Sequence, residues 1–458
     1  MRRLIDTLRR GYAFVRERGV SAVLEPQIAT TVPEITPFDA RPDASDARPR
    51  GSAVALHRLD LRTHALPELR SRRHRQRFGR AGDAEVFRRS RCGVSEPARA
   101  AGGGAHTAVT LYRSLLERFP RSRIILLDSS PRDEALTRFP DHVRVDAADD
   151  RVDAPRQIVG FNQRYGATIP VGRGDRWMAT AWWTAYAAQS ATQWQAGQCW
   201  GDPPLLYFIQ DFEPGFYPWS SQSAVAQSTY RADVDLGVFN TSLLRDYFAA
   251  QGIAYARQVV IEPTLNAALR PAEISGSHRE RRILVYARPS VPRNALALIC
   301  EGLRAWGWSD ARCRDWQVLG IGELDRDLDL GPFVLRGLGK LTLADYRANL
   351  QQAAIGVSLM LSPHPSYPPL EMAAFGMSTI SNRFANKDLS RDFDNVRSVA
   401  SLSPAGLAAA LREEVDAWES AGMRQRWTLS DTHPYLTGDP LPQETQREIG
   451  RWIDESWR

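Results

Sequence analysis

The stretch LMLSPHPSYPPLEMAAFG, residues 359–376, decides the fold that this sequence predicts. It begins inside the apolar run 355–361, which is typical of a buried strand. A proline-rich loop follows, and we expect its prolines to prevent a helix, because proline lacks the backbone N–H and restricts the residue before it. These prolines are Pro363, Pro365, Pro368 and Pro369.

After this loop the pattern predicts a short helix that begins near Leu370, carries Glu371 in its first turn and ends at Gly376. A second apolar strand, 378–381, comes next. Strand, polar loop, helix and strand together place a ligand at the carboxyl edge of a parallel sheet. The loop supplies hydrogen-bonding groups that suit an anionic, hydroxyl-rich ligand such as a nucleoside diphosphate sugar: Ser362, His364, Ser366 and Tyr367.

Length and composition narrow the class of protein. A chain of 458 residues predicts two domains with additional segments. No apolar run approaches the ~20 residues of a membrane-spanning helix, and no signal peptide is visible. The cysteines lack the spacing of a zinc site, so we expect no metal and a reducing, cytoplasmic compartment. They are Cys92, Cys199, Cys300 and Cys313.

The net charge of +6 comes almost entirely from arginine, because only two of the 59 basic residues are lysines. Coding bias accounts for such a composition. Lys340 and Lys387 remain candidates for function, since a lysine supplies a compact charge that arginine does not reproduce. Both lie close to the stretch 359–376 in sequence.

The first hundred residues do not follow the pattern of the rest. Residues 1–20 have the periodicity of a basic amphipathic helix, which favours either a membrane surface or packing on the protein itself. Residues 25–50 resemble a linker, and 52–61 has the pattern of a strand. The arginine-rich segment 62–101 predicts an irregular surface insertion, with a gene-model error as an alternative. Without interleaved aromatic residues it does not favour nucleic-acid binding.

From residue 102 onward the sequence alternates between strand and helix patterns, which indicates an α/β fold. Gly102, Gly103 and Gly104 predict a glycine loop before a helix at 107–119, as in Rossmann-like units, although a plain tight turn explains them equally well. The predicted strands of this half are 124–127, 157–161, 177–181, 205–209 and 236–240.

Aromatic and polar residues are mixed in the segment after the strand 205–209. Aromatic rings stack on the apolar faces of sugars and carboxylates bind their hydroxyls, so this segment is a candidate site for a glycan acceptor. A purely structural loop is the alternative. The candidate acceptor-binding residues are Asp211, Glu213, Tyr217 and Trp219.

A second α/β unit begins at Arg282, with predicted strands at 283–287 and 316–321. Thr342 and Asp345 have the spacing of a helix cap. Several charged residues and one glycine follow predicted strands, which favours a site at the sheet edge over scattered surface charge. They are Arg288, Arg293, Gly322, Lys340 and Glu371.

Several motifs resemble the WsaF-type rhamnosyltransferases of bacterial surface-glycan synthesis, within the retaining GT-B glycosyltransferases of family 4. The resemblance covers roughly residues 102–400 and implies a GT-B fold, with two Rossmann-like domains that face each other across a cleft. The motifs are TAWWTAY (180–186), YFIQDFEPGFYPWSSQ (207–222), VYARPSVPRNA (285–295), LGKLTLADY (338–346), SLMLSPHPSYPPLEMAAFG (358–376) and NKDLS (386–390).

The resemblance also implies residue roles. Arg288 and Arg293 match the basic residues that bind the donor diphosphate, and Lys340 matches a lysine near these phosphates. Glu371 matches the second glutamate of the family's E-x7-E motif, which binds the ribose. The first glutamate is replaced by Pro363, so no carboxylate assists from that side.

The enzyme implied by this resemblance transfers L-rhamnose from dTDP-L-rhamnose to a glycan or lipid-linked glycan, with no metal or other cofactor. It would be cytoplasmic, with peripheral contact to the inner face of the plasma membrane. The domains would follow an N-terminal helix and linker, and a last helix would return to the acceptor domain. Their expected limits are 1–50, 51–270 for the acceptor domain, 280–435 for the donor domain and 440–458 for the last helix.

Two other classes of protein remain open. A sugar-nucleotide epimerase of the same fold would need acid and base residues in the N-terminal domain, for which Asp211, Glu213 and His106 are candidates. A non-catalytic binding protein of a glycan locus would not bind the nucleotide.

Overall fold

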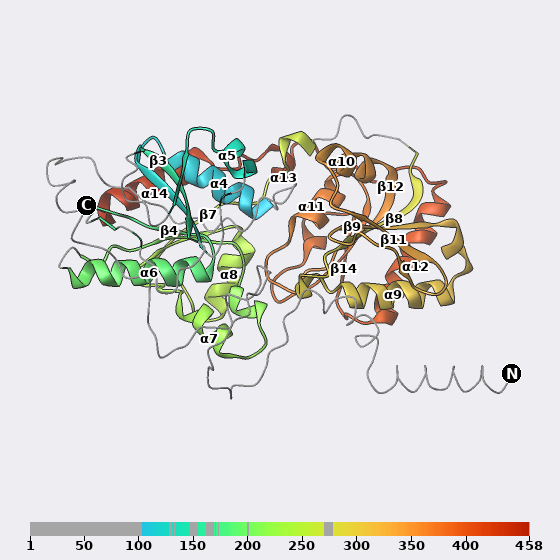
Figure 1. Cartoon of the computed structure of the whole chain (residues 1–458). Helices are drawn as coiled ribbons and strands as arrows, with labels where there is room; N and C mark the ends of the chain where they lie inside the picture. The colour runs from blue at the N-terminus through green and yellow to red at the C-terminus, as the bar shows by residue number, and fades with distance from the viewer. Residues whose placement is uncertain are drawn as a thin grey trace, which may run out of the picture.

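The computed structural model describes residues 103–457, except 128–130, 132, 147–153, 162–168, 170, 173, 199–200 and 270–277. The predictions for residues 1–102 therefore lie outside the described residues. Two α/β lobes lie side by side (Figure 1), which we call the N-terminal and C-terminal domains. Each consists of parallel strands with helices packed on them.

The N-terminal domain contains a three-stranded sheet, β1-β3-β2, and a four-stranded sheet, β4-β5-β6-β7. All of their pairings are parallel. Residues of both sheets contribute to two shared cores, one on each face. The elements are α4 (Gly103–Leu115), β1 (Ser122–Leu127), α5 (Asp133–Arg138), β2 (Val143–Asp146), β3 (Arg156–Phe161), β4 (Met178–Ala179), α6 (Trp182–Gly197), β5 (Leu206–Ile209), α7 (Ser221–Ser228), β6 (Leu236–Phe239), α8 (Ser242–Ala250) and β7 (Arg257–Val260).

The C-terminal domain is built on one sheet with the order β10-β11-β9-β8-β12-β13-β14, in which only the β10–β11 pair is antiparallel. From β8 the chain moves outward on one side, then returns to place β12 on the other side of β8. The elements are β8 (Glu280–Ala287), α9 (Leu296–Ser309), β9 (Gln317–Gly322), β10 (Leu328–Asp329), β11 (Val334–Gly339), α10 (Leu343–Gln352), β12 (Ala353–Val357), α11 (Tyr367–Ala374), β13 (Ser378–Asn382), β14 (Val396–Val399) and α12 (Pro404–Ser420).

The chain then crosses back through α13 (Pro434–Thr437) to α14 (Gln443–Ser456), which lies on the N-terminal domain (Figure 1). Ile449, Trp452 and Ile453 of α14 are buried in the same core as α4 and β1. The indole N–H of Trp457 donates to the carbonyl oxygen of Pro204 at 2.8 Å. The last helix therefore completes the N-terminal domain.

One strong local signal was read correctly from the sequence. Thr342 caps α10, and its hydroxyl accepts the N–H of Asp345 at 3.1 Å. The buried side of this helix includes Leu350, with Leu343 and Tyr346 packed against the same core.

The helix after the proline loop differs from the prediction. It begins at Tyr367, so Pro368 and Pro369 lie in its first turn and Glu371 lies in its second. Proline is tolerated in the first turn because the N–H groups there have no partner within the helix. The same two prolines remove two of the N–H groups that we expected this helix start to offer to a ligand.

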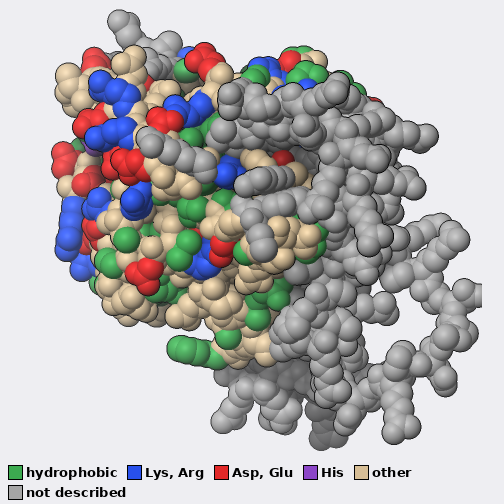
Figure 2. Space-filling view, turned by 90° about the vertical axis from the view of Figure 1, so that its left-hand side faces the viewer, with side chains coloured by type: hydrophobic (Ala, Val, Ile, Leu, Met, Phe, Trp, Pro, Cys, Tyr) green, Lys and Arg blue, Asp and Glu red, His purple; other side chains and the backbone are tan. Residues whose placement is uncertain are grey.

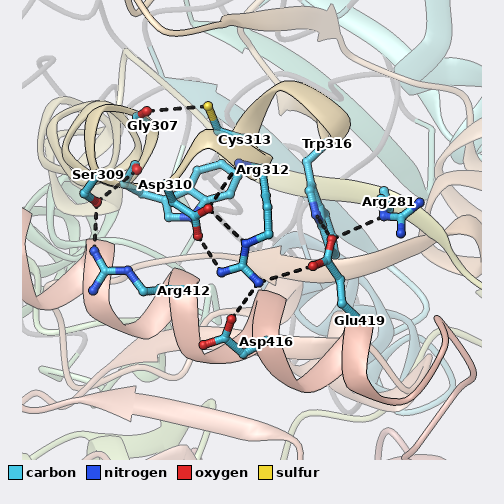
Figure 3. A network of polar contacts seen from close by, with 11 residues as sticks. Arg281, Gly307, Ser309, Asp310, Arg312, Cys313, Trp316, Arg412, Asp416 and Glu419 are labelled. Carbon is cyan, nitrogen blue, oxygen red and sulfur yellow. Dashed lines mark hydrogen bonds and ion pairs between the residues drawn. The ribbon is translucent and has the colours of Figure 1, made fainter.

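A charged network lies at the opposite, amino edge of the C-terminal sheet (Figure 3). Arg312 pairs with Asp310 at 2.7 Å, with Asp416 at 2.6 Å and with Glu419 at 3.2 Å, so that it joins the segment before β9 to α12. Its position at the amino ends of the strands indicates a structural role.

The outer face of the N-terminal domain carries acidic and basic side chains interspersed over the described part of its surface (Figure 2). Among the described residues, no helix is both long enough and apolar enough to span a membrane.

Candidate functional site

The C-terminal sheet reverses its direction of growth between β8 and β12, which are neighbours in the sheet but far apart in sequence. In open α/β sheets, the loops at the carboxyl ends of two such strands diverge and leave a crevice that binds ligands. The loop after β8 carries Arg288, and the loop after β12 carries residues 358–366. The stretch on which the sequence analysis began therefore lies at the switch point.

Arg288 is held at this edge by a carboxylate from the neighbouring strand. Its Nε donates to Glu323 Oε1 at 2.9 Å, and the hydroxyl of Ser290 donates to the other oxygen. Burial opposes ionisation of Glu323, but the hydrogen bonds from Ser290 and Arg288 outweigh it and lower the pKa of Glu323. This ion pair fixes the direction of Arg288 and leaves part of its guanidinium exposed.

Gly322 makes this close arrangement of strand ends feasible. Its φ is +115°, and a Cβ there would lie 2.9 Å from the carbonyl oxygen of Ala287. A side chain at this position would push apart the ends of β8 and β9. The residue that we proposed for donor binding therefore has a clear structural requirement for glycine.

Arg293 faces the other domain. Its guanidinium forms an ion pair with Asp211 at 3.3 Å and lies 3.5 Å above the ring of Phe216. Burial lowers the pKa of Arg293, although Asp211 and Glu213 oppose this shift. The two arginines proposed for the diphosphate thus differ, since Arg288 is oriented within its own domain and Arg293 across the domain boundary.

Lys340 follows β11 and is exposed. In the sheet, β11 is separated from β8 by β9. Lys340 therefore lies at the same edge as Arg288 but farther from the switch point.

The loop after β12 contacts the N-terminal domain. The hydroxyl of Ser362 donates to Asp211, which follows β5. His364 Nε2 lies 3.1 Å from the side-chain amide of Asn240, which follows β6. The carboxyl edges of the two parallel sheets therefore face each other, which is the geometry predicted for the cleft.

His364 is uncharged at neutral pH, because burial lowers its pKa to about 4. Its Nδ1 accepts the N–H of Ser366 at 3.0 Å. Ser366 has a φ of +68°, an uncommon conformation for a residue other than glycine. Backbone strain at this position is consistent with a loop held in one conformation.

Tyr367 also reaches across the boundary. Its hydroxyl lies 3.2 Å from that of Thr107 on α4 and 3.4 Å from Asn240. Of the donor-binding residues proposed from this loop, His364 and Tyr367 therefore contact the N-terminal domain.

Glu371 lies at the inner side of α11, beneath this loop. One of its oxygens accepts the hydroxyl of Tyr346 at 2.5 Å. Loss of solvation on burial raises the pKa of Glu371 to about 7, although part of its side chain remains accessible to solvent. A carboxylate in this position combines fixed direction with access, as binding of ribose hydroxyls would require.

In the N-terminal domain, Asp211 and Glu213 are both buried. Glu213 accepts the backbone N–H of Trp182 at 2.5 Å and the hydroxyl of Tyr207 at 3.3 Å. Burial, reinforced by the charge of Asp211, raises the pKa of Glu213 to about 8. At neutral pH one of these two neighbours is therefore a neutral acid.

The two aromatic candidates for the acceptor differ in exposure. The hydroxyl of Tyr217 accepts the indole N–H of Trp182 at 3.0 Å, so this ring is fixed near Glu213. Trp219 is fully exposed at 102%. It lies two residues from Tyr217 and is open to any ligand that approaches this segment.

The glycine loop does not have the predicted form. Gly103 and Gly104 lie in the first turn of α4, so the helix starts four residues earlier than Thr107. Gly102 lies outside the described residues. The sequence Gly-Gly-Gly was read as a turn because glycine disfavours helices, but it is tolerated at a helix start.

Three residues at the site were not among the predicted site residues. Glu323 forms the ion pair that orients Arg288. The side-chain amide of Asn240 lies within hydrogen-bond distance of His364 and Tyr367, and Lys387 donates to the loop after β12. Their positions directly after strands were the available signal for Glu323 and Asn240. Lys387 was distinguished by its rarity in this composition and by its place in the motif NKDLS (386–390).

Comparison with known proteins agrees with this geometry. Residues 96–242 match the family described as WsaF, N-terminal domain, and residues 281–412 match the family described as WsaF, C-terminal domain. The two matches together cover more than half of the chain.

A curated relative is the O-antigen biosynthesis protein RfbC of Myxococcus xanthus, which is 29% identical over 247 residues. The match covers 52% of this chain but only 18% of RfbC, so this chain spans under a fifth of that relative. Among solved structures, Anabaena HepE in complex with UDP and glucose has a TM-score of 0.50 and 10% identity. This match covers 80% of this chain and 99% of HepE, and it supports the fold.

Both family matches follow the order of the two domains, and the similar structure supports the fold. The chain belongs to the WsaF family of glycosyltransferases and has the GT-B fold.

Proposed function

We propose that this protein transfers L-rhamnose from dTDP-L-rhamnose to a growing surface polysaccharide or O-antigen glycan. Family membership supports a sugar transfer, and the name of RfbC supports a role in O-antigen synthesis. HepE, a structure of similar fold, was solved with UDP and glucose, which supports a nucleotide-sugar donor here.

One observation carries the proposal. Arg288 follows β8, Glu371 lies in α11 after the loop that follows β12, and that loop meets Asp211 of the opposite domain. This arrangement supports a donor side with a cation for the diphosphate and a carboxylate for the ribose. Carboxyl groups suited to a glycan hydroxyl lie on the acceptor side.

The proposed chemistry is mainly electrostatic. Negative charge accumulates on the diphosphate as the bond to the sugar breaks, and Arg288, Arg293 and Lys340 would stabilise it without a metal. In a retaining reaction of this kind the departing phosphate can accept the proton of the attacking hydroxyl. The enzyme then needs no dedicated base.

The acceptor would bind beside Asp211, Glu213 and Tyr217, with Trp219 available for stacking on a sugar ring. Glu213 is mostly protonated at neutral pH and would donate a hydrogen bond to a sugar oxygen, whereas Asp211 would accept one. We place the enzyme in the cytoplasm, with peripheral contact to the membrane where lipid-linked acceptors reside.

The test is a donor panel with product analysis. The purified protein is incubated with dTDP-rhamnose, UDP-glucose, UDP-galactose and GDP-mannose, each with a rhamnose-containing acceptor, and products are identified by mass spectrometry. We expect a mass increase of one deoxyhexose with dTDP-rhamnose alone. Transfer from another donor would refute the rhamnose assignment, and an epimerised nucleotide sugar formed without acceptor would refute transfer as the reaction.

A further inference from the structure

The loop after β12 is fastened from both neighbouring strands. On the β8 side, the N–H of Leu361 donates to Arg293 O at 2.8 Å, and Asn294 Nδ2 donates to Leu359 O at 3.1 Å. On the β13 side, Asn382 accepts the N–H of Met360 at 2.7 Å and donates to its carbonyl at 3.1 Å. These hydrogen bonds hold the backbone of the loop at the switch point in one conformation.

Lys387 adds hydrogen bonds from the segment after β13. Its Nζ donates to Met360 O at 2.6 Å and to His364 O at 3.4 Å. The side chain is buried, and its own backbone is held by paired hydrogen bonds with Phe384. One side-chain amino group therefore joins the two ends of the turn 360–364.

This turn presents the two side chains that reach the N-terminal domain. Ser362 contacts Asp211, and His364 contacts Asn240. Lys387 is the contact that ties the carbonyl of His364 to the segment after β13. The placement of the cross-domain contacts thus depends on the segment after β13.

We propose that Lys387 is a positioning residue, whose buried amino group closes the turn 360–364 and so holds Ser362 and His364 against the acceptor domain. The effect on turnover rests on the proposed function, whereas the effect on the loop does not. The lysine does not touch the reacting atoms in this scheme. It acts through the two side chains that the turn carries.

The neutral variant Lys387→Met should fold. It removes a charge that is costly to bury, and Met360 O keeps its hydrogen bond from Asn382. Only the weaker contact to His364 O is left without its donor. Lys387→Gln, which keeps one amide donor without the charge, is the second variant.

Hydrogen exchange read by mass spectrometry tests the loop directly. In Lys387→Met, peptides that cover 359–366 should exchange at least tenfold faster, while a peptide that covers β9 keeps its wild-type rate. Asn386→Ala is the matched control, because Asn386 donates to Leu243 O at 2.8 Å and has no recorded contact with the turn. It should leave the exchange of 359–366 unchanged.

An unchanged rate in Lys387→Met would overturn the proposal. If that variant does not fold, Lys387→Gln is measured in the same way. Loss of the fold in both would also refute it, because Lys387 would then support the whole domain and not this turn.

Kinetics provide a second readout. With the donor and acceptor that the wild-type enzyme uses, Lys387→Met should lower kcat about tenfold or more and change the KM for the donor less than threefold. Lys387→Gln should have a smaller loss of kcat than Lys387→Met. An equal kcat in the wild type and in Lys387→Met would contradict a positioning role for Lys387. If the wild type transfers no sugar, the proposed function fails, while the exchange experiment still decides the role of Lys387 in the loop.

Discussion

The guanidinium of Arg293 lies 3.5 Å above the ring of Phe216 while it pairs with Asp211 at 3.3 Å. All three groups meet where the two domains touch. Arg293 therefore has two partners in the acceptor domain, although it belongs to the loop proposed to bind the donor diphosphate.

If Arg293 also serves the diphosphate, the nucleotide must compete with Asp211 for it. Asp211→Asn should then tighten dTDP binding about threefold to tenfold, since a contact of about 1 kcal/mol no longer opposes it. Sugar transfer should fall at the same time, because the acceptor domain loses its carboxylate. Calorimetry with dTDP measures the first effect, and weaker binding by this variant would show that Arg293 does not exchange partners.

Arg288 has a different environment and gives a different expectation. Arg288→Ala should lower turnover on the order of 100-fold, because positive charge near the diphosphate matters most in the transition state. Arg281→Ala is the control, since Arg281 pairs with Glu419 at the amino edge of the same sheet. Equal losses in the two variants would point to a general electrostatic effect instead of a local one.

Metal independence is tested on the wild-type enzyme. We expect EDTA to leave its rate nearly unchanged, because arginine and lysine side chains are proposed to neutralise the leaving group. A strict requirement for Mg²⁺ would contradict this proposal.

Variants of Glu371 and Tyr346 distinguish the binding of the nucleotide by Glu371 from the orientation of its carboxylate by Tyr346. Glu371→Ala should weaken dTDP binding by roughly 1–3 kcal/mol, the scale of a hydrogen bond to a charged group. Tyr346→Phe removes only the 2.5 Å contact that orients the carboxylate, so its effect should be smaller. Unchanged dTDP affinity in Glu371→Ala, measured by calorimetry, would exclude a ribose contact.

The sequence predicted the structure correctly where a local pattern of residues has a single structural explanation. Apolar runs such as 283–287 marked the strands, and the Thr342–Asp345 pair marked a helix start, because these signals depend only on neighbouring residues. Charged residues directly after strands then defined the sheet edge. The prediction that Arg288 and Glu371 belong to one site followed from that rule.

The remaining features depend on contacts between distant segments. Nothing near Asn240 in sequence indicates His364, which lies 124 residues away. The start of α11 was placed too late because proline was read as a helix breaker, although it is acceptable in a first turn. Lys387 was visible as a rare residue type within the motif NKDLS, but its hydrogen bonds to Met360 and His364 could be seen only in the folded chain.

Arg279 gives a prediction about stability that is separate from the cleft. It is fully buried, and its guanidinium donates to the carbonyl oxygens of Leu350 at 2.6 Å and of Phe375, which lie near the ends of α10 and α11. Arg279→Met should lower the free energy of unfolding by about 2–4 kcal/mol, because several buried carbonyl groups lose their donor. Urea denaturation measures the loss, and a change below about 1 kcal/mol would contradict this role.

Glu213 should make the stability of the protein depend on pH. Its pKa is about 8 when folded, against an ordinary value of 4.5, so the folded state keeps a proton that the unfolded state loses between these two values. Its contribution to stability is therefore fully present below pH 4.5 and is lost as the pH rises to about 8.

Glu213→Gln keeps the shape of the neutral acid without this titration. Relative to wild type, the variant should gain at least about 2 kcal/mol in free energy of unfolding between pH 5 and pH 8, since each pKa unit corresponds to about 1.4 kcal/mol. Parallel urea curves for the two proteins at both pH values measure this difference. A constant difference between them would mean that Glu213 is ionised in the folded protein.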